Sequence, residues 1–140
     1  MITDNKEREI LGRFDIDPDL TVLIYIPPER SYTADIDVDK TKQLSEIVDS
    51  VHKKALNGKI YGAQTVNGLL YSSVLGFDFQ PALDALEAGA KSAGLTGTGP
   101  ATVAICEKEK VESVKKKWKK RANRVIETRP SEEGARIENE

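Results

Sequence analysis

Two short apolar runs constrain the fold of this chain more than any other feature of its sequence. Residues 21–26 (TVLIYI) and residues 101–106 (ATVAIC) are rich in β-branched side chains, and Pro27-Pro28 ends the first run. Continuous runs of this length and composition predict buried strands. The long stretch between the two runs must hold other elements, so we expect a sheet whose strands are separated by helices.

Apolar residues at helical spacing fill the stretch between these strands. A first helix is expected to end near Leu56, at Asn57-Gly58. Its inner face would consist of Leu44, Ile47, Val48, Val51 and Ala55. A second helix, from Ile60 to about Leu75, is apolar on most sides and is therefore expected to be largely buried. Pro81 predicts the start of a third helix that runs to Ala93, with Gly94 as its stop. The inner face of this third helix would consist of Leu83, Leu86 and Ala90.

The remaining segments alternate between helix and strand. We expect a basic helix over 108–121, a strand over Arg124–Thr128 and an edge strand over Gly134–Glu138. Residues 4–12 are expected to form a short helix or an extended segment, with no strand before them. The order β, three helices, β, α, β, β predicts a single α+β domain over residues 1–140. Its architecture would be a ferredoxin-like sandwich, a small, mainly antiparallel sheet with helices packed on it.

Composition excludes several classes of protein. A net charge of −2 argues against a dedicated nucleic-acid binder. The single cysteine excludes a disulfide framework and a cysteine-built zinc site, and it is typical of the reducing cytoplasm, where we expect the protein. No apolar run approaches 18 residues, which predicts no membrane span. The polar N-terminus predicts no signal peptide.

A basic run with an aromatic centre, residues 115–121 (KKKWKKR), could bind RNA. However, Val111, Val114, Trp118 and Ala122 share one face of a helix. This spacing favours Trp118 as a core residue and the lysines as the solvated back of the helix.

Signals for metal binding or nucleophilic catalysis are weak. Four acidic residues have the spacing of a calcium loop, but Lys40 stands where that loop requires glycine, so helix capping is favoured. These residues are Asp35, Asp37, Asp39 and Glu46. His52 is the only histidine, and Cys106 at a strand end is expected to be a buried, inert thiol. We therefore expect no metal site.

The most informative segment is residues 94–100 (GLTGTGP). Glycines permit positive φ and close approach of the backbone to a ligand, and threonine hydroxyls add hydrogen-bond donors. The expected order of elements here is helix, loop, strand, which is unlike a Walker loop and gives a bound anion no help from a helix dipole. We interpret the segment as a loop that faces an anion.

Polar residues on the helix 60–75 form a second candidate feature. Gln64, Asn67 and Tyr71 share one face of this otherwise apolar helix. Buried polar side chains need partners. They either satisfy neighbouring backbone groups or line a polar pocket, and the sequence leaves both open.

Four stretches in order resemble one known family. They are Thr3-Asp4-Asn5, residues 28–35 (PERSYTAD), residues 67–71 (NGLLY) and residues 93–100 (AGLTGTGP). The last stretch resembles the third motif of the GHMP kinases, a superfamily of small-molecule kinases. Together the stretches resemble the archaeal-type shikimate kinases, and the likeness covers nearly the whole chain.

The resemblance implies the C-terminal half of a kinase. The complete enzyme would transfer the γ-phosphoryl group of ATP to the 3-hydroxyl of shikimate with Mg²⁺. The family's Gly-Leu-Gly-Ser-Ser-type phosphate loop and its catalytic aspartate have no match here, and Asp4 does not correspond to that aspartate. We therefore expect no catalytic residue in this chain, no ATP or Mg²⁺ bound to it alone, and an N-terminal half as its partner.

The resemblance also implies candidate binding residues. The phosphate and substrate side of the closed site would be formed by Gly94, Thr96, Gly97, Thr98 and Gly99. Further candidates for binding shikimate are Arg30, Thr33, Gln64 and Asn67, since an arginine suits a carboxylate. No nucleic acid or membrane is expected as a partner, and a homodimer could form through a surface that is normally covered.

Three alternatives stay open. The chain could be a fragment of another GHMP-type kinase, with a different substrate. It could be a stand-alone ferredoxin-like module that binds a metabolite through residues 94–100. It could also be an RNA-associated module that uses Lys115 to Arg121.

Overall fold

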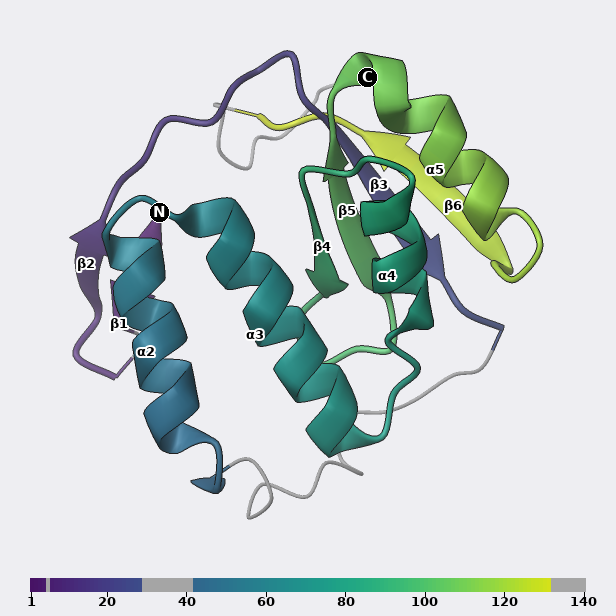
Figure 1. Cartoon of the computed structure of the whole chain (residues 1–140). Helices are drawn as coiled ribbons and strands as arrows, with labels where there is room; N and C mark the ends of the chain where they lie inside the picture. Colours follow the sequence, from purple (N-terminus) through teal and green to yellow (C-terminus); the bar gives the residue numbers. More distant parts are fainter. Residues whose placement is uncertain (5, 29–41, 132–140) are drawn as a thin grey trace, which may run out of the picture.

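The computed structural model describes residues 1–4, 6–28 and 42–131. Arg30 and Thr33, the aspartates at 35, 37 and 39, and the predicted strand over 134–138 lie outside the described residues. The described part contains a four-stranded sheet, a two-stranded sheet and the helices that pack beside them (Figure 1). No helix in this part is both long enough and apolar enough to cross a membrane.

The larger sheet has the strand order β4-β5-β3-β6, with every neighbouring pair antiparallel. Its strands are β3 (Thr21–Ile26), β4 (Ser92–Leu95), β5 (Thr102–Cys106) and β6 (Arg124–Thr128). In the centre, Leu23 lies opposite Ala104 on β5 and Glu127 on β6. Helices connect β3 to β4 and β5 to β6. This is the arrangement of two split βαβ units, which confirms the ferredoxin-like sandwich predicted from the sequence.

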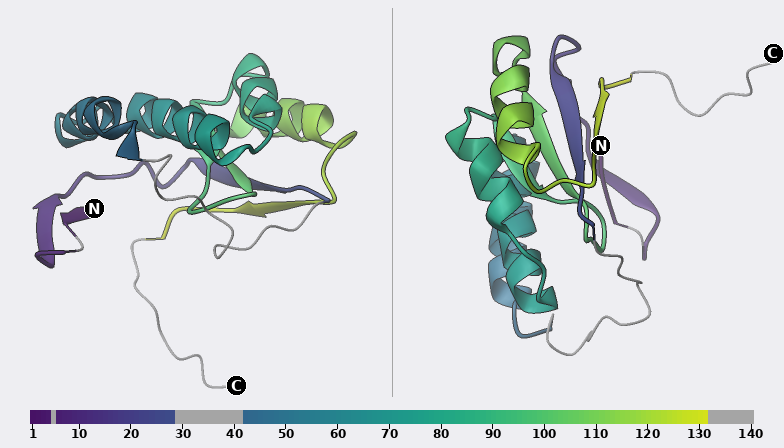
Figure 2. Two further views of the ribbon diagram at one scale, coloured as in Figure 1. Left: turned by 90° about the horizontal axis from the view of Figure 1, so that it is seen from below. Right: turned by 90° about the vertical axis from the view of Figure 1, so that its right-hand side faces the viewer.

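The helices cover one face of this sheet, as both views of Figure 2 show. They are α2 (Ser45–Leu56), α3 (Ile60–Leu75), α4 (Gln80–Glu87) and α5 (Val111–Trp118), the last preceded by the 3₁₀ turn η2 (Lys108–Lys110). The two-stranded sheet is a hairpin of β1 (Ile2–Asp4) and β2 (Glu9–Gly12), and it lies beyond α2 (Figure 1). The expectation that no strand precedes the charged segment is therefore wrong.

The core lies between the sheet and the helices α4 and α5. Trp118 is 1% exposed, and its indole N–H donates a hydrogen bond of 2.8 Å to the carbonyl of Pro81 at the start of α4. Its ring meets Tyr25 edge to face at 5.4 Å between centroids. The Tyr25 hydroxyl in turn donates to the carbonyl of Arg121. These contacts confirm Trp118 as a core residue, since aromatic pairs and a satisfied indole N–H are typical of buried tryptophan.

The predicted third helix is too long. The helix α4 ends at Glu87, and Gly89 follows with φ +97°, a conformation that stops a helix. Residues 92–95 then form β4, so Gly94 is a buried strand residue and not a helix stop. The predicted inner face is correct in part, because Leu86 and Ala90 pack against the core, whereas Leu83 is only half-buried. The buried residues of α4 are Pro81, Ala82 and Ala85.

Burial of the first two helices is lower than predicted. The helix α3 has the predicted bounds, but only Ala63, Gly68 and Ser72 are buried, and Val66 is 39% exposed. In α2, Val51 is buried, and Ile47 is 49% exposed where an inner position was expected. The helix α3 packs along the edge strand β4, and α2 packs on α3, so each of them leaves apolar side chains exposed among the described residues.

Candidate functional site

The glycine-rich segment is the turn of a β-hairpin between β4 and β5. The Thr96 N–H donates to the carbonyl of Ala101 at 2.9 Å, and the Gly99 N–H donates to the carbonyl of Thr96 at 3.1 Å. Gly97, the first central residue of this turn, has φ +57°. Hairpin turns of this kind require a glycine there. The order is therefore strand, loop, strand, and the prediction of a preceding helix is wrong, along with the dipole argument that rested on it.

The helix α3 holds β4 in place along the strand's outer edge. A Cβ atom on Gly68 would lie 2.5 Å from the Cα atom of Gly94, so the two backbones cross in direct contact. Beside this crossing the Ser92 hydroxyl donates to Oε1 of Gln64 at 2.5 Å. The Ala93 N–H donates to Oγ1 of Thr65 at 3.2 Å. Side chains of a helix thus occupy the edge that a neighbouring strand would otherwise pair with.

Sequence reasoning missed two residues of this crossing, Gly68 and Thr65. A signal was present for Gly68, because an isolated glycine inside an apolar helix costs stability unless something must approach closely. Thr65 gave no signal of its own. Together these residues fix where β4 ends and therefore where the turn 96–99 begins.

The two glycines of the turn have different surroundings. A Cβ atom on Gly97 would meet nothing within 4 Å, and Gly97 is exposed. A Cβ atom on Gly99 would lie 2.6 Å from the ring of Phe77 and 3.0 Å from Leu95. Gly97 therefore offers backbone that a ligand can approach, whereas Gly99 is required by packing and by its φ of +78°.

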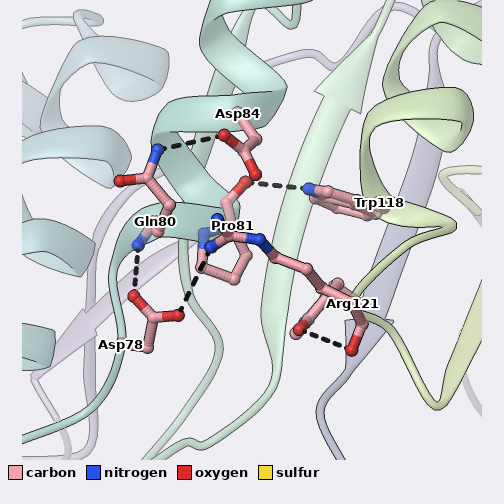
Figure 3. A network of polar contacts seen from close by, with 7 residues as sticks. Asp78, Gln80, Pro81, Asp84, Trp118 and Arg121 are labelled. Carbon is pink, nitrogen blue, oxygen red and sulfur yellow. Dashed lines mark hydrogen bonds and ion pairs between the residues drawn. The ribbon is translucent and has the colours of Figure 1, made fainter.

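Phe77 is fixed by the connection between α3 and α4. The helix α3 ends with Gly76 at φ +73°, and the Phe77 N–H donates to the carbonyl of Ser72, which forms a Schellman motif. Figure 3 shows the next contacts along the chain, where Asp78 accepts from the N–H of Gln80 and lies 4.0 Å from Arg121. The turn thus packs on the Phe77 ring, and hydrogen bonds to α3 and α4 hold the backbone on either side of Phe77.

The predicted polar face of α3 lies elsewhere. Gln64 and Asn67 line a cavity of about 460 Å³ between α2 and α3, and no residue of the turn 96–99 belongs to its lining. The other lining residues are Met1, Ile2, Phe14, Ile16, Val48, Val51, His52, Ala55, Ile60 and Ala63. Gln64 fits neither open reading as stated, because its partner is the Ser92 side chain and not a backbone group. That pocket is mainly apolar.

Three titratable groups with raised pKa values lie either in the core or in surface ion pairs. Burial raises the pKa of Cys106 to about 11, so the thiol is protonated at neutral pH and is a poor nucleophile. Hydrogen bonds to Glu127 and Glu112 raise the pKa of Lys115, and a hydrogen bond to Glu87 raises that of Lys117. The basic helix is thus partly paired, and its aromatic residue is buried. No group of three or more His, Cys, Asp or Glu that could hold a metal occurs in the part of the chain described.

Comparisons with known proteins show what this chain is similar to. Residues 65–124 match the family model described as GHMP kinases C terminal. A shikimate kinase from Methanothermobacter thermautotrophicus is 42% identical over 136 residues, which cover 97% of this chain and 47% of that protein. A shikimate kinase from Methanobrevibacter smithii is 41% identical over 129 residues, which cover 92% of this chain and 44% of that protein. The chain spans about half the length of the curated relatives it matches.

A solved structure shares the fold. The crystal structure of L. major mevalonate kinase in complex with R-mevalonate aligns with a TM-score of 0.58 at 17% identity, over 80% of this chain and 43% of that chain. At this identity the likeness concerns the fold alone. The comparisons confirm the resemblance predicted from the sequence, to the C-terminal domain of GHMP kinases and to archaeal shikimate kinases.

Proposed function

We propose that this chain supplies the C-terminal half of an ATP-dependent kinase that phosphorylates shikimate. A second half would hold the nucleotide and supply the catalytic groups, either in the same polypeptide or as a separate subunit. The observation that carries this proposal is the glycine turn within a match that covers nearly the whole chain. Relatives named shikimate kinase match 97% and 92% of it, and the turn presents open backbone at Gly97.

The turn suits a phosphate group. Gly97 and its neighbours Thr96 and Thr98 are exposed, and no side chain fills the space in front of Gly97. The N–H groups of Thr96 and Gly99 donate within the turn, so the donors that it offers to phosphate oxygens are the Gly97 N–H and the Thr96 hydroxyl. We assign the ligands for Mg²⁺ to the other half, as the resemblance to GHMP kinases implies. When bound, ATP with its metal would supply the phosphoryl group and neutralise its developing charge.

The role of this chain is positioning. The Phe77 ring packs against Gly99 of the turn. Side chains of α3 hold β4, the strand that leads into the turn. A turn held in this way would present its donors without reorganising during the reaction, which is where electrostatic catalysis gains most. Gln64 and Asn67 have a weaker case as shikimate ligands, because nine of the twelve residues that line their cavity are apolar and suit a carboxylate poorly.

A fused enzyme tests this proposal. It joins the part of the Methanothermobacter thermautotrophicus relative that lies outside the match to the front of this chain, and release of ADP is measured with shikimate, homoserine and mevalonate. We expect turnover with shikimate and none above background with the other two alcohols. Turnover with homoserine or mevalonate but not with shikimate would keep the assignment as a GHMP-type kinase and reject shikimate as the substrate. A folded enzyme without turnover on any of them would overturn the kinase assignment.

A further inference from the structure

Large exposed apolar side chains gather at one end of the molecule. Seven such residues occur in the described part of the chain, and five of them belong to β2, the segments beside the hairpin, or α2. These five are Met1, Ile10, Leu11, Ile16 and Ile47, with exposed fractions from 42% to 70%. Scattered apolar side chains are ordinary on a protein surface, but a concentration at one end indicates a surface that binds another protein.

The hairpin β1–β2 is the clearest case. Ile10 and Leu11 are consecutive in β2, so their side chains point to opposite faces of the hairpin. Both are more than two fifths exposed, so neither face is covered by the residues described. The hairpin pairs with no strand of the larger sheet. An isolated two-stranded hairpin is marginally stable in water, so this one needs further contacts.

The cavity between α2 and α3 opens beside the hairpin. Met1, Ile2, Phe14 and Ile16 contribute to its lining, so the N-terminal segment forms one wall. Nine of its twelve lining residues are apolar, and the other three are His52, Gln64 and Asn67. Shikimate and ATP are anionic, and neither matches such a lining. An apolar protein surface does.

We propose that the hairpin β1–β2 and the mouth of this cavity form the docking surface for the other half of the kinase. This inference rests on the proposed function, since it takes its partner from there. The relatives are about twice as long as this chain, so a partner of comparable size is to be accommodated. A stable interface of this kind buries about 800 Å² on each partner, with an apolar centre. The docking surface provides that centre.

Cysteine labelling tests the docking surface. Ile16→Cys places a thiol at the cavity mouth, and Phe79→Cys places one at a site of similar exposure, 44% against 45%, at the start of α4. Labelling by a maleimide is followed by mass spectrometry in this chain alone and in the fused enzyme. Cys106 is buried, so its labelling reports unfolding. We expect Ile16→Cys to label at least tenfold more slowly in the fused enzyme and Phe79→Cys to label equally fast in both.

Three labelling outcomes would overturn the proposal. Equal labelling of Ile16→Cys in both proteins would leave the docking surface uncovered. Equal protection of both cysteines would indicate general compaction. Protection of Ile16→Cys in the chain alone that grows with protein concentration would make a second copy the occupant. Labelling of Cys106 in the fused enzyme would show that the fused enzyme is unfolded. The comparison is then made in the Methanothermobacter thermautotrophicus relative, with cysteines at the positions that align with Ile16 and Phe79, and the same difference in labelling rate is expected there.

Failure of the two proposals can be told apart. Protection at Ile16→Cys without phosphorylation of shikimate would keep the docking surface and reject the substrate. Phosphorylation of shikimate without protection at Ile16→Cys would keep the function and reject the docking surface.

Discussion

Trp118 is the single side chain on which most of the core depends. It is 1% exposed, its indole N–H is bonded to Pro81, and its ring packs on Tyr25. We expect Trp118→Ala to lower the free energy of unfolding in urea by about 3–5 kcal/mol, as large aromatic truncations do. Trp118→Phe should cost less, because much of the buried ring remains. A loss below about 1 kcal/mol for the alanine variant would contradict this packing.

Cys106 gives stability a pH dependence in the alkaline range. Burial raises its pKa from 9.0 to about 11, so the folded state holds the thiol proton more tightly than the unfolded state does. Its contribution is therefore complete below pH 9 and is lost as pH rises towards 11. We expect the melting temperature to fall over that interval, and to fall less in Cys106→Ala. Tyr25, whose pKa burial also raises, would account for part of the remaining slope. Equal slopes in both proteins would refute the assignment.

The crossing of α3 and β4 is the contact between elements that governs the candidate site. A Cβ atom on Gly68 would lie 2.5 Å from backbone of β4, so Gly68→Ala must push the helix and strand apart. We expect a loss of about 1–3 kcal/mol in urea denaturation. The matched control is Gly62→Ala in the same helix, where nothing lies within 4 Å. That variant should gain up to about 1 kcal/mol from helix propensity. Equal effects of the two would rule out a tight crossing.

Gly99 should act mainly through stability. Gly99→Val places a branched side chain against Phe77 at φ +78°, and we expect a loss of about 1–3 kcal/mol in the free energy of unfolding. The sequence had suggested that Gly97 and Gly99 are equivalent, and their surroundings separate them. Unchanged unfolding of Gly99→Val would contradict the contact with Phe77.

Gly97 should act mainly through activity. In the fused enzyme, we expect Gly97→Val to lower kcat/KM for shikimate roughly 100-fold, about 2.7 kcal/mol of transition-state stabilisation. Gly97→Asn separates steric blocking from backbone strain, because asparagine tolerates positive φ. It should unfold nearly as the parent does and still lose activity. If both variants keep a kcat/KM near that of the parent, the turn only connects β4 to β5 and has no role in catalysis.

Elements with a strong local pattern were predictable, and elements imposed by their neighbours were not. The strand β3 and the helix α3 agree with the sequence because each carries its own apolar pattern. The strand β4 (Ser-Ala-Gly-Leu) has small residues and no such pattern, and it is a strand because β5 and α3 satisfy its two edges. The turn was predicted from its glycines. Which glycine faces open space depends on Phe77, which lies 22 residues earlier than Gly99 in the chain.

At the scale of the whole molecule, the chain combines a complete core with an uncovered end. The ferredoxin-like sheet, α4 and α5 enclose Trp118, and the hairpin and α2 leave apolar side chains exposed. The sandwich was predicted correctly although one of its strands, β4, was expected to be the end of a helix. The uncovered end could not be predicted, because it depends on which apolar residues of α2 and the hairpin find partners in three dimensions.

One measurement decides whether this chain needs a second half for activity. Phosphorylated shikimate is quantified by mass spectrometry after incubation with ATP and Mg²⁺, for this chain alone and for the fused enzyme at equal concentration. We expect product from the fused enzyme and none above background from the chain alone. Product from the chain alone that depends on ATP and is lost in Gly97→Val would contradict it.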